Sequence, residues 1–549
     1  MLKLMRTIKA GILCRYMVLA WLAALPVAHS QEWLYTVRPG DNLWSITAEH
    51  LVRMDYWPKL QALNGVANPG QLPPGSKLRI PIAWLKRLPA MVQVISIQGQ
   101  VQATLAATGQ IAPIQVGQFL ESGDSVQTGP DGNITLAFGD GSRTLVQADS
   151  QLTLESLRSR GRTNVMDTVL SLLQGRVENR VIPRLEAGSR YQISTPVATS
   201  AVRGTHYRFG MDSGAEIARM EVLEGGVAFQ GERGSRSVSE GFGALAQAGK
   251  PLAPPVALLA APDTKSLPPV VTRVPIQLRF AALKGAVAYR AQIASTERFE
   301  TLLFDGSLTL PGVRGPDLPD GDYVLRLRAI DAQGLEGRDA YHRFRLHARP
   351  EPPLLIYPAH ESALLAPSLR FEWSEPAKAV AYHFQLADDE GFATPLLDIA
   401  DHPNPKLTPE RTLEPRRYYW RVAVRDNTGR EGPFSDPQRV RVQPVLALQP
   451  PEVAAETITF RWGAGLPGQK YEFQMARDTD FEDVIVSRQV SEPQLTVPRP
   501  DSGFHYLRMR SIDTDGFIGP YGATQRIDVP PASYWPAGWV TFLALILVL

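Results

Sequence analysis

The C-terminal half of the chain holds three copies of one sequence pattern, and this repetition constrains the fold more than any other feature. Three segments align without gaps: AYRAQIASTERF (288–299), AYHFQLADDEGF (381–392) and KYEFQMARDTDF (470–481). Three later segments align in the same way: YVLRLRAIDAQGLEG (323–337), YYWRVAVRDNTGREG (418–432) and HYLRMRSIDTDGFIG (505–519). Apolar and polar residues alternate in them, as in half-buried strands, and D-x-x-G motifs supply turns. A repeat of roughly 90 residues made of such strands predicts an antiparallel β-sandwich.

Proline-rich segments separate the three repeats from one another and from the N-terminal half of the chain. We therefore expect a linker at 248–272 and repeats at 273–347, 352–443 and 450–529. Because proline-rich linkers are extended and semi-rigid, the composition predicts a string of domains rather than one compact body.

The repeats resemble the fibronectin type III family. The resemblance rests on Trp373 and Trp462, on the pair Tyr419 and Trp420, and on the motif D-N-T-G-R-E-G-P. The first repeat departs from it with Phe280 where the other two have tryptophan. The resemblance implies a β-sandwich, but it implies no activity, because such domains serve as spacers and as adhesive surfaces alike.

One arginine recurs at an equivalent position of each repeat, as Arg326, Arg421 and Arg508. A ladder of arginines could bind an anionic ligand. Cross-strand partners on a solvated face would explain the pattern equally well, and we favour this second interpretation.

The N-terminus has the features of a secretory signal. Basic residues precede the apolar run MVLAWLAALPVA (17–28), and small residues follow before Gln31. This order predicts a signal peptide at 1–30 and export, with an uncleaved N-terminal anchor as the alternative. The only cysteine, Cys14, lies in this segment. A processed chain would therefore have no thiol for catalysis, disulfides or metal binding.

The other end of the sequence is apolar and uncharged, because residues 535–549 read WPAGWVTFLALILVL. The run is shorter than the roughly 20 residues that span a bilayer. We expect membrane association here, either through a short anchor or because the given chain stops inside a longer one. A buried terminal strand is the alternative.

Residues 92–247 have a different sequence pattern, in which glycines separate short runs of alternating apolar and polar residues. This pattern predicts an all-β, turn-rich domain. Its segments resemble, in order, the periplasmic domain of the FecR family: SGDSVQTGPDGNITLAFGDGS (122–142), LLQGRV (172–177), STPVATSAVRGTHYRF (194–209) and VLEGGV (222–227). The resemblance implies a Gram-negative-type envelope and a sensing or scaffolding role outside the cytoplasm. A signal peptide and another domain stand where family members carry a cytoplasmic regulatory region, so we do not expect direct control of a sigma factor.

Residues 31–84 combine a turn, two helical patterns and two short strands. The first strand, at 35–37, ends in a Pro-Gly turn, and the alternating KLRIPI (77–82) is the second. Asp41 is the predicted N-cap of a helix that begins one or two residues later, and Pro58 is the predicted first residue of a second helix. The segment predicts a β-α-α-β unit.

This unit resembles a LysM domain over its whole length, through Y-T-V-R-P-G-D-N-L-W-S-I (35–46), L-Q-A-L-N (60–64), N-P-G-Q-L (68–72) and P-P-G-S-K-L-R-I-P (73–81). The resemblance implies binding of a glycan that contains N-acetylglucosamine, in a shallow groove between two loops. Mapped onto this sequence, the groove would be formed by Gly40, Asp41, Asn42 and Leu43 on one side and by Asn68, Pro69 and Gln71 on the other. The alternative is that Asp41 only caps the helix, Leu43 belongs only to the core, and the glycan site is lost.

The sequence contains no motif whose residues and spacing are typical of a catalytic or metal-binding site. Its 57 basic and 55 acidic residues nearly balance, which gives no reason to expect nucleic acid as a partner. Val202–His206 brings Arg, Thr and His together, but no carboxylate in the segment orients His206. Asp140 between glycines is typical of a turn rather than of a calcium loop. We therefore expect no catalytic residues, no metal and no cofactor, although a carboxylate pair far apart in the chain stays open.

The predicted fold is mainly β and multidomain, with a small β-α-α-β LysM unit, an all-β FecR-like domain and three β-sandwich repeats. These parts favour a non-enzymatic peptidoglycan-binding protein of the periplasm, anchored at the membrane if 535–549 inserts. The first alternative is an envelope sensor whose FecR-like domain passes a signal to an inner-membrane protein partner. The second is a peptidoglycan hydrolase.

Overall fold

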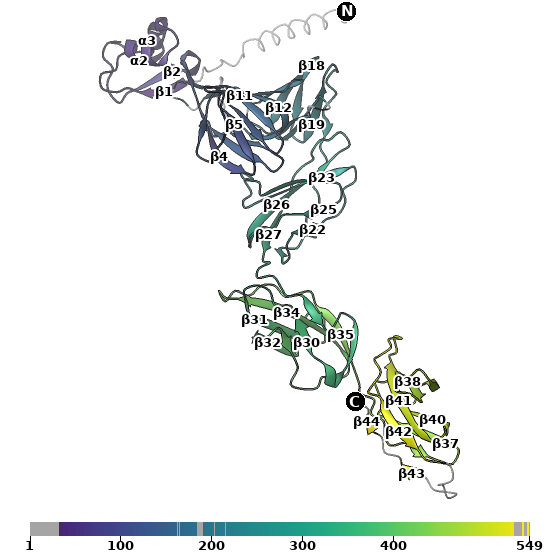
Figure 1. Ribbon diagram of the computed structural model, residues 1–549. Coiled ribbons are helices and arrows are strands. Elements are labelled where there is room, and N and C mark those ends of the chain that lie inside the picture. Colours follow the sequence, from purple (N-terminus) through teal and green to yellow (C-terminus); the bar gives the residue numbers. More distant parts are fainter. Residues whose placement is uncertain are drawn as a thin grey trace, which may run out of the picture. The chain divides into compact units, whose positions relative to one another are not determined.

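The computed structural model describes residues 32–161, 163, 165–183, 190–202, 204–212, 214, 216–531, 541–542 and 546–547. Within this part the chain forms two compact units. The N-terminal unit comprises the described residues up to Pro269, with Pro275–Leu318 and Asp322–Arg345, and the C-terminal unit comprises the rest. The fold is mainly β and multidomain, as predicted (Figure 1). The expected signal peptide, 1–30, lies outside the described residues.

A small α/β unit begins the described chain. Strands β1 (Glu32–Thr36) and β2 (Lys77–Pro81) pair antiparallel, and helices α2 (Leu43–His50) and α3 (Trp57–Asn64) lie between them in sequence. Two 3₁₀ helices, η1 (Met54–Tyr56) and η2 (Ile82–Trp84), complete the unit. The predicted β-α-α-β order is confirmed. Pro58 is the second residue of α3 rather than the first, because η1 leads directly into the helix at Trp57.

Apolar residues of the first helical segment, hereafter the apolar stripe, form the core of this unit. Leu43, Ile46 and Leu51 are buried there. Val165, which precedes a strand of the next domain, packs in the same core, and the backbone N–H of Gly161 donates to the carbonyl of Lys86 at 2.7 Å. Packing as well as chain connection therefore joins the α/β unit to the domain that follows.

That domain, hereafter the β-domain, is all-β as predicted, and its strands form one closed, continuously hydrogen-bonded structure. The strands are β3 (Arg87–Pro89), β4 (Val92–Gln98), β5 (Val101–Thr104), β6 (Ile111–Pro113), β7 (Phe119–Leu120), β8 (Ser125–Thr128), β9 (Asn133–Phe138), β10 (Arg143–Val146), β11 (Gln151–Arg160), β12 (Met166–Arg180), β13 (Arg190–Ser194), β14 (Ala198–Val202), β15 (His206–Asp212), β16 (Ile217–Glu224), β17 (Gly226–Gly231), β18 (Gly234–Ser239), β19 (Phe242–Gln247) and β20 (Val256–Ala257). Alternate side chains along these strands fill one apolar core.

The first repeat completes the N-terminal unit with two small sheets. In one sheet β27, β26, β23 and β24 are neighbours in this order, and in the other β22 pairs with β25. The strands are β22 (Gln277–Arg279), β23 (Ala288–Ala294), β24 (Phe304–Leu308), β25 (Gly312–Arg314), β26 (Gly321–Ile330) and β27 (Ala340–Leu346).

The C-terminal unit holds the second and third repeats, each built from two sheets. The second repeat has the sheets β28-β30-β33 and β29-β35-β34-β31-β32, and the third has β40-β37-β36-β43 and β39-β38-β41-β42-β44. The strands are β21 (Val270–Val271), β28 (Leu355–Tyr357), β29 (Ser362–Leu365), β30 (Phe371–Trp373), β31 (Ala379–Ala387), β32 (Leu397–His402), β33 (Lys406–Leu407), β34 (Arg417–Asp426), β35 (Gln438–Gln443), β36 (Glu452–Val453), β37 (Thr457–Arg461), β38 (Lys470–Ala476), β39 (Val484–Val490), β40 (Gln494–Pro498), β41 (Gly503–Ile512) and β42 (Gln525–Val529), with the 3₁₀ helix η3 (Ala366–Ser368).

An edge-to-face aromatic pair occupies the same place in the core of each repeat. The pairs, with ring centroids 5.0, 5.5 and 5.5 Å apart, are Phe280–Tyr289, Trp373–Tyr382 and Trp462–Tyr471. The first repeat therefore keeps this packing although phenylalanine replaces tryptophan in it.

Only two pieces of the apolar segment 535–549 are described. They are the strands β43 (Thr541–Phe542), which pairs with β36, and β44 (Ile546–Leu547), which pairs with β42. The remainder of the expected membrane anchor lies outside the described residues. In the part of the chain that the structure describes, no helix is long and apolar enough to cross a membrane.

Candidate functional site

The cap of the first helix differs from the prediction by one residue. The helix α2 begins at Leu43, so Asn42 is its N-cap, and the backbone N–H of Ser45 donates to Asn42 Oδ1 at 2.8 Å. In return, the backbone N–H of Asn42 donates to Ser45 Oγ at 3.0 Å, which completes a capping box. Asp41 stands one residue too early to cap the free N–H groups of the first turn. The prediction that Asp41 caps the helix is therefore wrong.

Replacing Asn42 by alanine should lower the stability of the α/β unit by about 1 kcal/mol, because the cap loses its acceptor. Replacing it by aspartate should leave the stability nearly unchanged, since aspartate caps equally well. Thermal unfolding of both variants, followed by near-UV circular dichroism, measures the difference. Equal losses of stability in the two variants would show that Asn42 does not stabilise the unit through the helix cap.

Asp41 instead holds the turn before the helix. Its Oδ2 accepts hydrogen bonds from the Tyr35 hydroxyl and from the backbone N–H of Arg38, both at 2.7 Å. Burial, and then the hydrogen bond to Asp41, raise the pKa of the Tyr35 hydroxyl to about 12. Asp41 therefore fixes the loop geometry from inside, and a change at this position would act on the loop rather than on the helix cap.

The two loops predicted to flank the groove meet directly. The backbone N–H of Leu43 donates to the carbonyl of Pro69 at 2.9 Å, and the backbone N–H of Gly70 donates to Asn68 Oδ1 at 3.0 Å. Of the seven predicted site residues, the exposed ones are Gly40, Asn68 and Gln71, and the half-buried ones are Asp41, Asn42 and Pro69. The side chain of Leu43 is completely buried, so this residue can serve a surface site only through its backbone.

Trp44 is a candidate that the sequence analysis missed. Its side chain is 40% exposed, and its ring packs on Trp57 with the centroids 5.3 Å apart. A Cβ atom placed on Gly70 would lie 3.6 Å from Trp44 Cζ3, so the indole lies beside the loop that contains Asn68. The helical pattern of the sequence indicated that Trp44 faces outward, because this residue directly follows Leu43 of the apolar stripe. An exposed indole beside two polar loops can cover the face of a sugar ring.

The β-domain and the first repeat meet through buried charges. Glu178, in β12, accepts two hydrogen bonds from the guanidinium of Arg326, in β26, at 2.8 Å each. Arg208, in β15, contacts Asp339 at 2.5 Å and donates to the carbonyl of Gly337 at 3.0 Å. The side chains of Glu178, Arg208 and Arg326 are all buried. These contacts connect residues that are far apart in the chain. Sequence patterns within a single domain could not predict them.

Five arginines and five carboxylates meet in this charge network: Arg176, Arg208, Arg290, Arg326 and Arg328 with Glu178, Glu221, Asp305, Glu336 and Asp339. Buried charges are tolerated when each has a partner of opposite sign, and here the two signs balance. The β-domain and the first repeat therefore form one body. The predicted string of domains is wrong at this joint.

Neighbouring arginines lower the pKa of two of the buried carboxylates, Glu178 and Glu336. Burial alone would raise the pKa of Glu178, but the charge of Arg326, with His206 and Arg328, outweighs burial and holds this pKa well below its usual value of 4.5. The pKa of Glu336 is lowered for the same reason, with Arg176 as its main cation. For Glu221 burial prevails over Arg176, and its pKa is raised.

The N-terminal unit should lose stability in acid. Because the pKa values of Glu178 and Glu336 are lower in the folded chain, their contribution is complete above about pH 4.5 and is lost as the pH falls below that value. Glu221 opposes this trend, since its pKa is raised. Urea unfolding at pH 7 and pH 3 should show a smaller loss in Glu178→Gln than in the wild-type chain. Equal losses in the two chains would contradict the assignment to Glu178.

His206 has a carboxylate partner that its own segment does not contain. Its Nε2 lies 3.0 Å from Glu178 Oε1, and both side chains are buried. Arg326 holds the same carboxylate, so the arrangement supports the domain contact rather than proton transfer. Arg203, from the same motif, lies outside the described residues. Among the described residues no group of three or more His, Cys, Asp or Glu could hold a metal ion.

The repeated arginine has the same cross-strand partner in every repeat. The pairs are Arg326–Gln292, Arg421–Gln385 and Arg508–Gln474, and in each the arginine Nε donates to the glutamine Oε1, at 2.9, 2.9 and 2.8 Å. The prediction of cross-strand partners is confirmed. The predicted solvated face is wrong for Arg326, because the β-domain covers it.

Each of these guanidinium groups also stacks on an equivalent phenylalanine. The distances to the ring centroids are 4.3, 4.0 and 4.0 Å, and the rings are Phe299, Phe392 and Phe481. All three have a positive φ, of 49°, 55° and 60°. This conformation is uncommon outside glycine, so its recurrence shows that the stacked arginine is part of the repeat's architecture.

Several solved structures are similar to parts of this chain. Two crystal structures of a proposed anti-sigma factor from Parabacteroides distasonis ATCC 8503 each share 12% identity with a TM-score of 0.20, over 24% of this chain and 57% of that one. The chain thus spans a little over half the length of those two structures. Fibronectin(III)-like modules of Clostridium thermocellum CbhA share 14% identity with a TM-score of 0.18, over 34% of this chain and 98% of that one. The FN1–FN3 domains of chicken CNTN1 share 16% identity with a TM-score of 0.16, over 46% and 93%.

Comparison with curated proteins gives no match to this chain. Family models match two of its parts, and these are the parts in which the sequence showed a resemblance. Residues 35–81 match the model of the LysM domain, and residues 124–228 match the model of the FecR protein. Neither match indicates an enzyme family. The chain therefore contains a LysM domain followed by a FecR-type domain.

Proposed function

We propose that this protein binds peptidoglycan in the cell envelope without acting on it as an enzyme. The observation that carries the proposal is the LysM match over residues 35–81, on a unit whose two predicted binding loops meet through the Leu43–Pro69 hydrogen bond. Beside these loops lies the exposed Trp44. The β-domain and the repeats would position or bind a second envelope component.

We assign roles to the predicted site residues according to their exposure. The side chains of Asn68 and Gln71 and the backbone at Gly40 are exposed and would hydrogen-bond the acetamido and hydroxyl groups of the sugar. Asp41 and Asn42 would act mainly by fixing the loop and the helix start. Leu43 would supply core packing and one backbone hydrogen bond that joins the loops.

Calorimetric titration of the full chain with chitohexaose tests this proposal. Saturable binding of chitohexaose is expected, with no binding of cellohexaose, which has the same backbone but lacks the acetamido groups. The double variant Asn68→Ala, Gln71→Ala should bind more weakly, and Glu240→Ala, at an exposed position of the β-domain, should bind as the wild type does. No heat with chitohexaose, or equal heat with both sugars, would overturn the proposal.

We also propose that the protein is exported from the cytoplasm. Export through residues 1–30 to the periplasm, with residues 535–549 associated with the membrane, fits a protein whose ligand is the cell wall. Fractionation of cells that express the full chain tests it, because the protein should appear in the periplasmic or membrane fraction. Recovery in the cytoplasmic fraction would contradict the proposed location.

A sensing role is the second candidate, with an inner-membrane protein as partner. It is favoured by the FecR match over residues 124–228 and by the packing of Val165 in the core of the LysM domain. Through this contact, glycan binding would reach the β-domain. Hydrogen exchange with and without chitohexaose tests the coupling: slower exchange in β12 would support sensing, and unchanged exchange there would favour a passive scaffold.

A further inference from the structure

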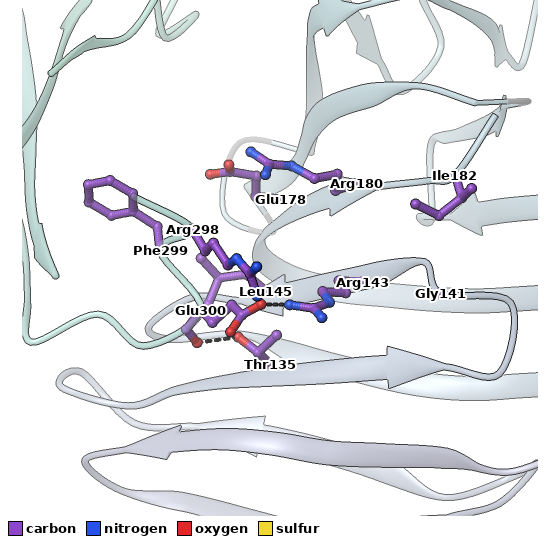
Figure 2. A pocket seen from close by; sticks show the side chains of 10 residues that line it. All are labelled: Thr135, Gly141, Arg143, Leu145, Glu178, Arg180, Ile182, Arg298, Phe299 and Glu300. Carbon is purple, nitrogen blue, oxygen red and sulfur yellow. Dashed lines mark hydrogen bonds and ion pairs between the residues drawn. The ribbon is translucent and has the colours of Figure 1, made fainter. Parts of the chain in front are cut away.

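A cavity of about 300 Å³ opens where the β-domain meets the first repeat (Figure 2). Two of its walls belong to the β-domain, through Arg143 in β10 and Arg180 at the end of β12. The third wall is the loop between β23 and β24, which carries Arg298 and Glu300. The volume lies at the small end of the range for ligand pockets, about 300–1,000 Å³.

The cavity has an excess of positive charge. Register places Arg143 directly opposite Arg180 on the neighbouring strand, an arrangement of like charges that is unfavourable without an anion nearby. Glu300 forms an ion pair with Arg143, and Figure 2 shows the two side chains in contact. The other carboxylate of the cavity, Glu178, is already engaged by Arg326 and His206.

Two arginines of the cavity are available to bind a ligand. Among the described residues, neither Arg180 nor Arg298 has an ion-pair partner, and both side chains are exposed. Leu145 and Phe299 also line the cavity, but both side chains are almost completely buried. A ligand that fits must therefore carry negative charge at two points.

We propose that this cavity binds a small dianionic compound that carries two carboxylate or phosphate groups. One anionic group would bind Arg180 and the other Arg298, since guanidinium groups hold carboxylate and phosphate oxygens through paired N–H donors. Because one arginine comes from each domain, such a ligand would tie the first repeat to the β-domain. This site is separate from the glycan-binding surface and does not depend on it.

Calorimetric titration of the full chain with phthalate, at low ionic strength, tests the proposal. Phthalate carries two carboxylates on one ring, and benzoate is the matched probe with a single carboxylate. We expect saturable binding of one phthalate per chain and at least ~10-fold weaker binding of benzoate, because one charge-assisted pair is lost.

The variant Arg180→Gln, Arg298→Gln should weaken phthalate binding by ~10-fold or more. It should fold normally, because both side chains are exposed. The matched control is Arg236→Gln, Arg314→Gln, which removes the same charge at exposed positions of the same two domains, away from the cavity. The control should bind as the wild type does. No saturable binding of phthalate, equal binding of benzoate, or an equal loss in the control would overturn the proposal.

Discussion

Replacing Glu178 by alanine is expected to lower the free energy of unfolding of the N-terminal unit by about 3–5 kcal/mol. The carboxylate is buried, and it accepts two hydrogen bonds from Arg326 at 2.8 Å. Without it, Arg326 stays buried without its ion-pair partner, and His206 loses its buried carboxylate partner.

Two further variants separate this effect from a general loss of charge. Glu240→Ala, at an exposed position of the same domain, should change the stability by no more than about 0.5 kcal/mol. The double variant Glu178→Leu, Arg326→Met should recover most of the lost stability, because both charges leave the interior together.

Hydrogen exchange is the measurement of choice, because a multidomain chain does not unfold in one step. In Glu178→Ala the backbone amides of β12 and β26 should exchange faster, while those of β34 and β41, in the other unit, should not change. If Glu178→Ala behaves like Glu240→Ala, the charge network does not hold the two domains together.

Replacing Trp44 by alanine is expected to weaken binding of chitohexaose by at least ~10-fold, because large aromatic anchors dominate the energy of binding surfaces. The indole lies beside the 68–71 loop and is 40% exposed. Phenylalanine at this position keeps an aromatic face and should retain part of the affinity.

The control for Trp44 is Met54→Ala, a half-exposed apolar residue of η1 in the same unit. It removes apolar surface without touching either loop and should leave the affinity unchanged. Thermal unfolding of both variants must be measured as well, since Trp44 packs on Trp57. Unchanged affinity in a folded Trp44→Ala variant would exclude the indole from the glycan site.

The sequence predicted those elements whose signals are local. In the LysM domain the stripe Leu43, Ile46 and Leu51 is the core, and the β-α-α-β order follows from it. In the repeats, two alternating segments per copy predicted the long central strands, which become β23 and β26 in the first copy. Local periodicity decides such elements because each strand or helix must bury one face.

The helix cap and the role of the exposed tryptophan could be identified only from the backbone structure. Aspartate and asparagine both cap helices well, so the adjacent Asp41 and Asn42 could not be told apart by residue type. Only the helix start at Leu43 makes Asn42 the cap. For Trp44, the sequence showed a position outside the apolar stripe, but not that the 68–71 loop lies beside it.

The charge network could not be predicted because it depends on contact between domains. Arg176, Glu178 and Arg180 share one face of β12, and such a charged strand face is usually solvated. Alternation identifies the polar face of a strand but not whether another domain covers it. Here the first repeat covers Glu178 with its own Arg326 and Arg328.

The proline-rich segments also behaved differently from the prediction. In the segment 248–272, β20 pairs with β19, and Leu258 and Leu267 are buried, so the segment is packed rather than free. In the C-terminal unit, Gln443 of the second repeat and Gln469 of the third are hydrogen-bonded and buried. Proline restricts the backbone locally, but buried apolar side chains and hydrogen bonds determine how these segments pack against their neighbours.

Co-sedimentation of the full chain with insoluble peptidoglycan tests the central claim most directly. The wild-type protein should be found in the pellet, chitohexaose in excess should release it, and Trp44→Ala should stay mostly in the supernatant. Arg180→Gln, Arg298→Gln should sediment as the wild type does, since the cavity is separate from the glycan site. A folded wild-type protein that remains in the supernatant, or that chitohexaose fails to release, would contradict peptidoglycan binding through the LysM domain.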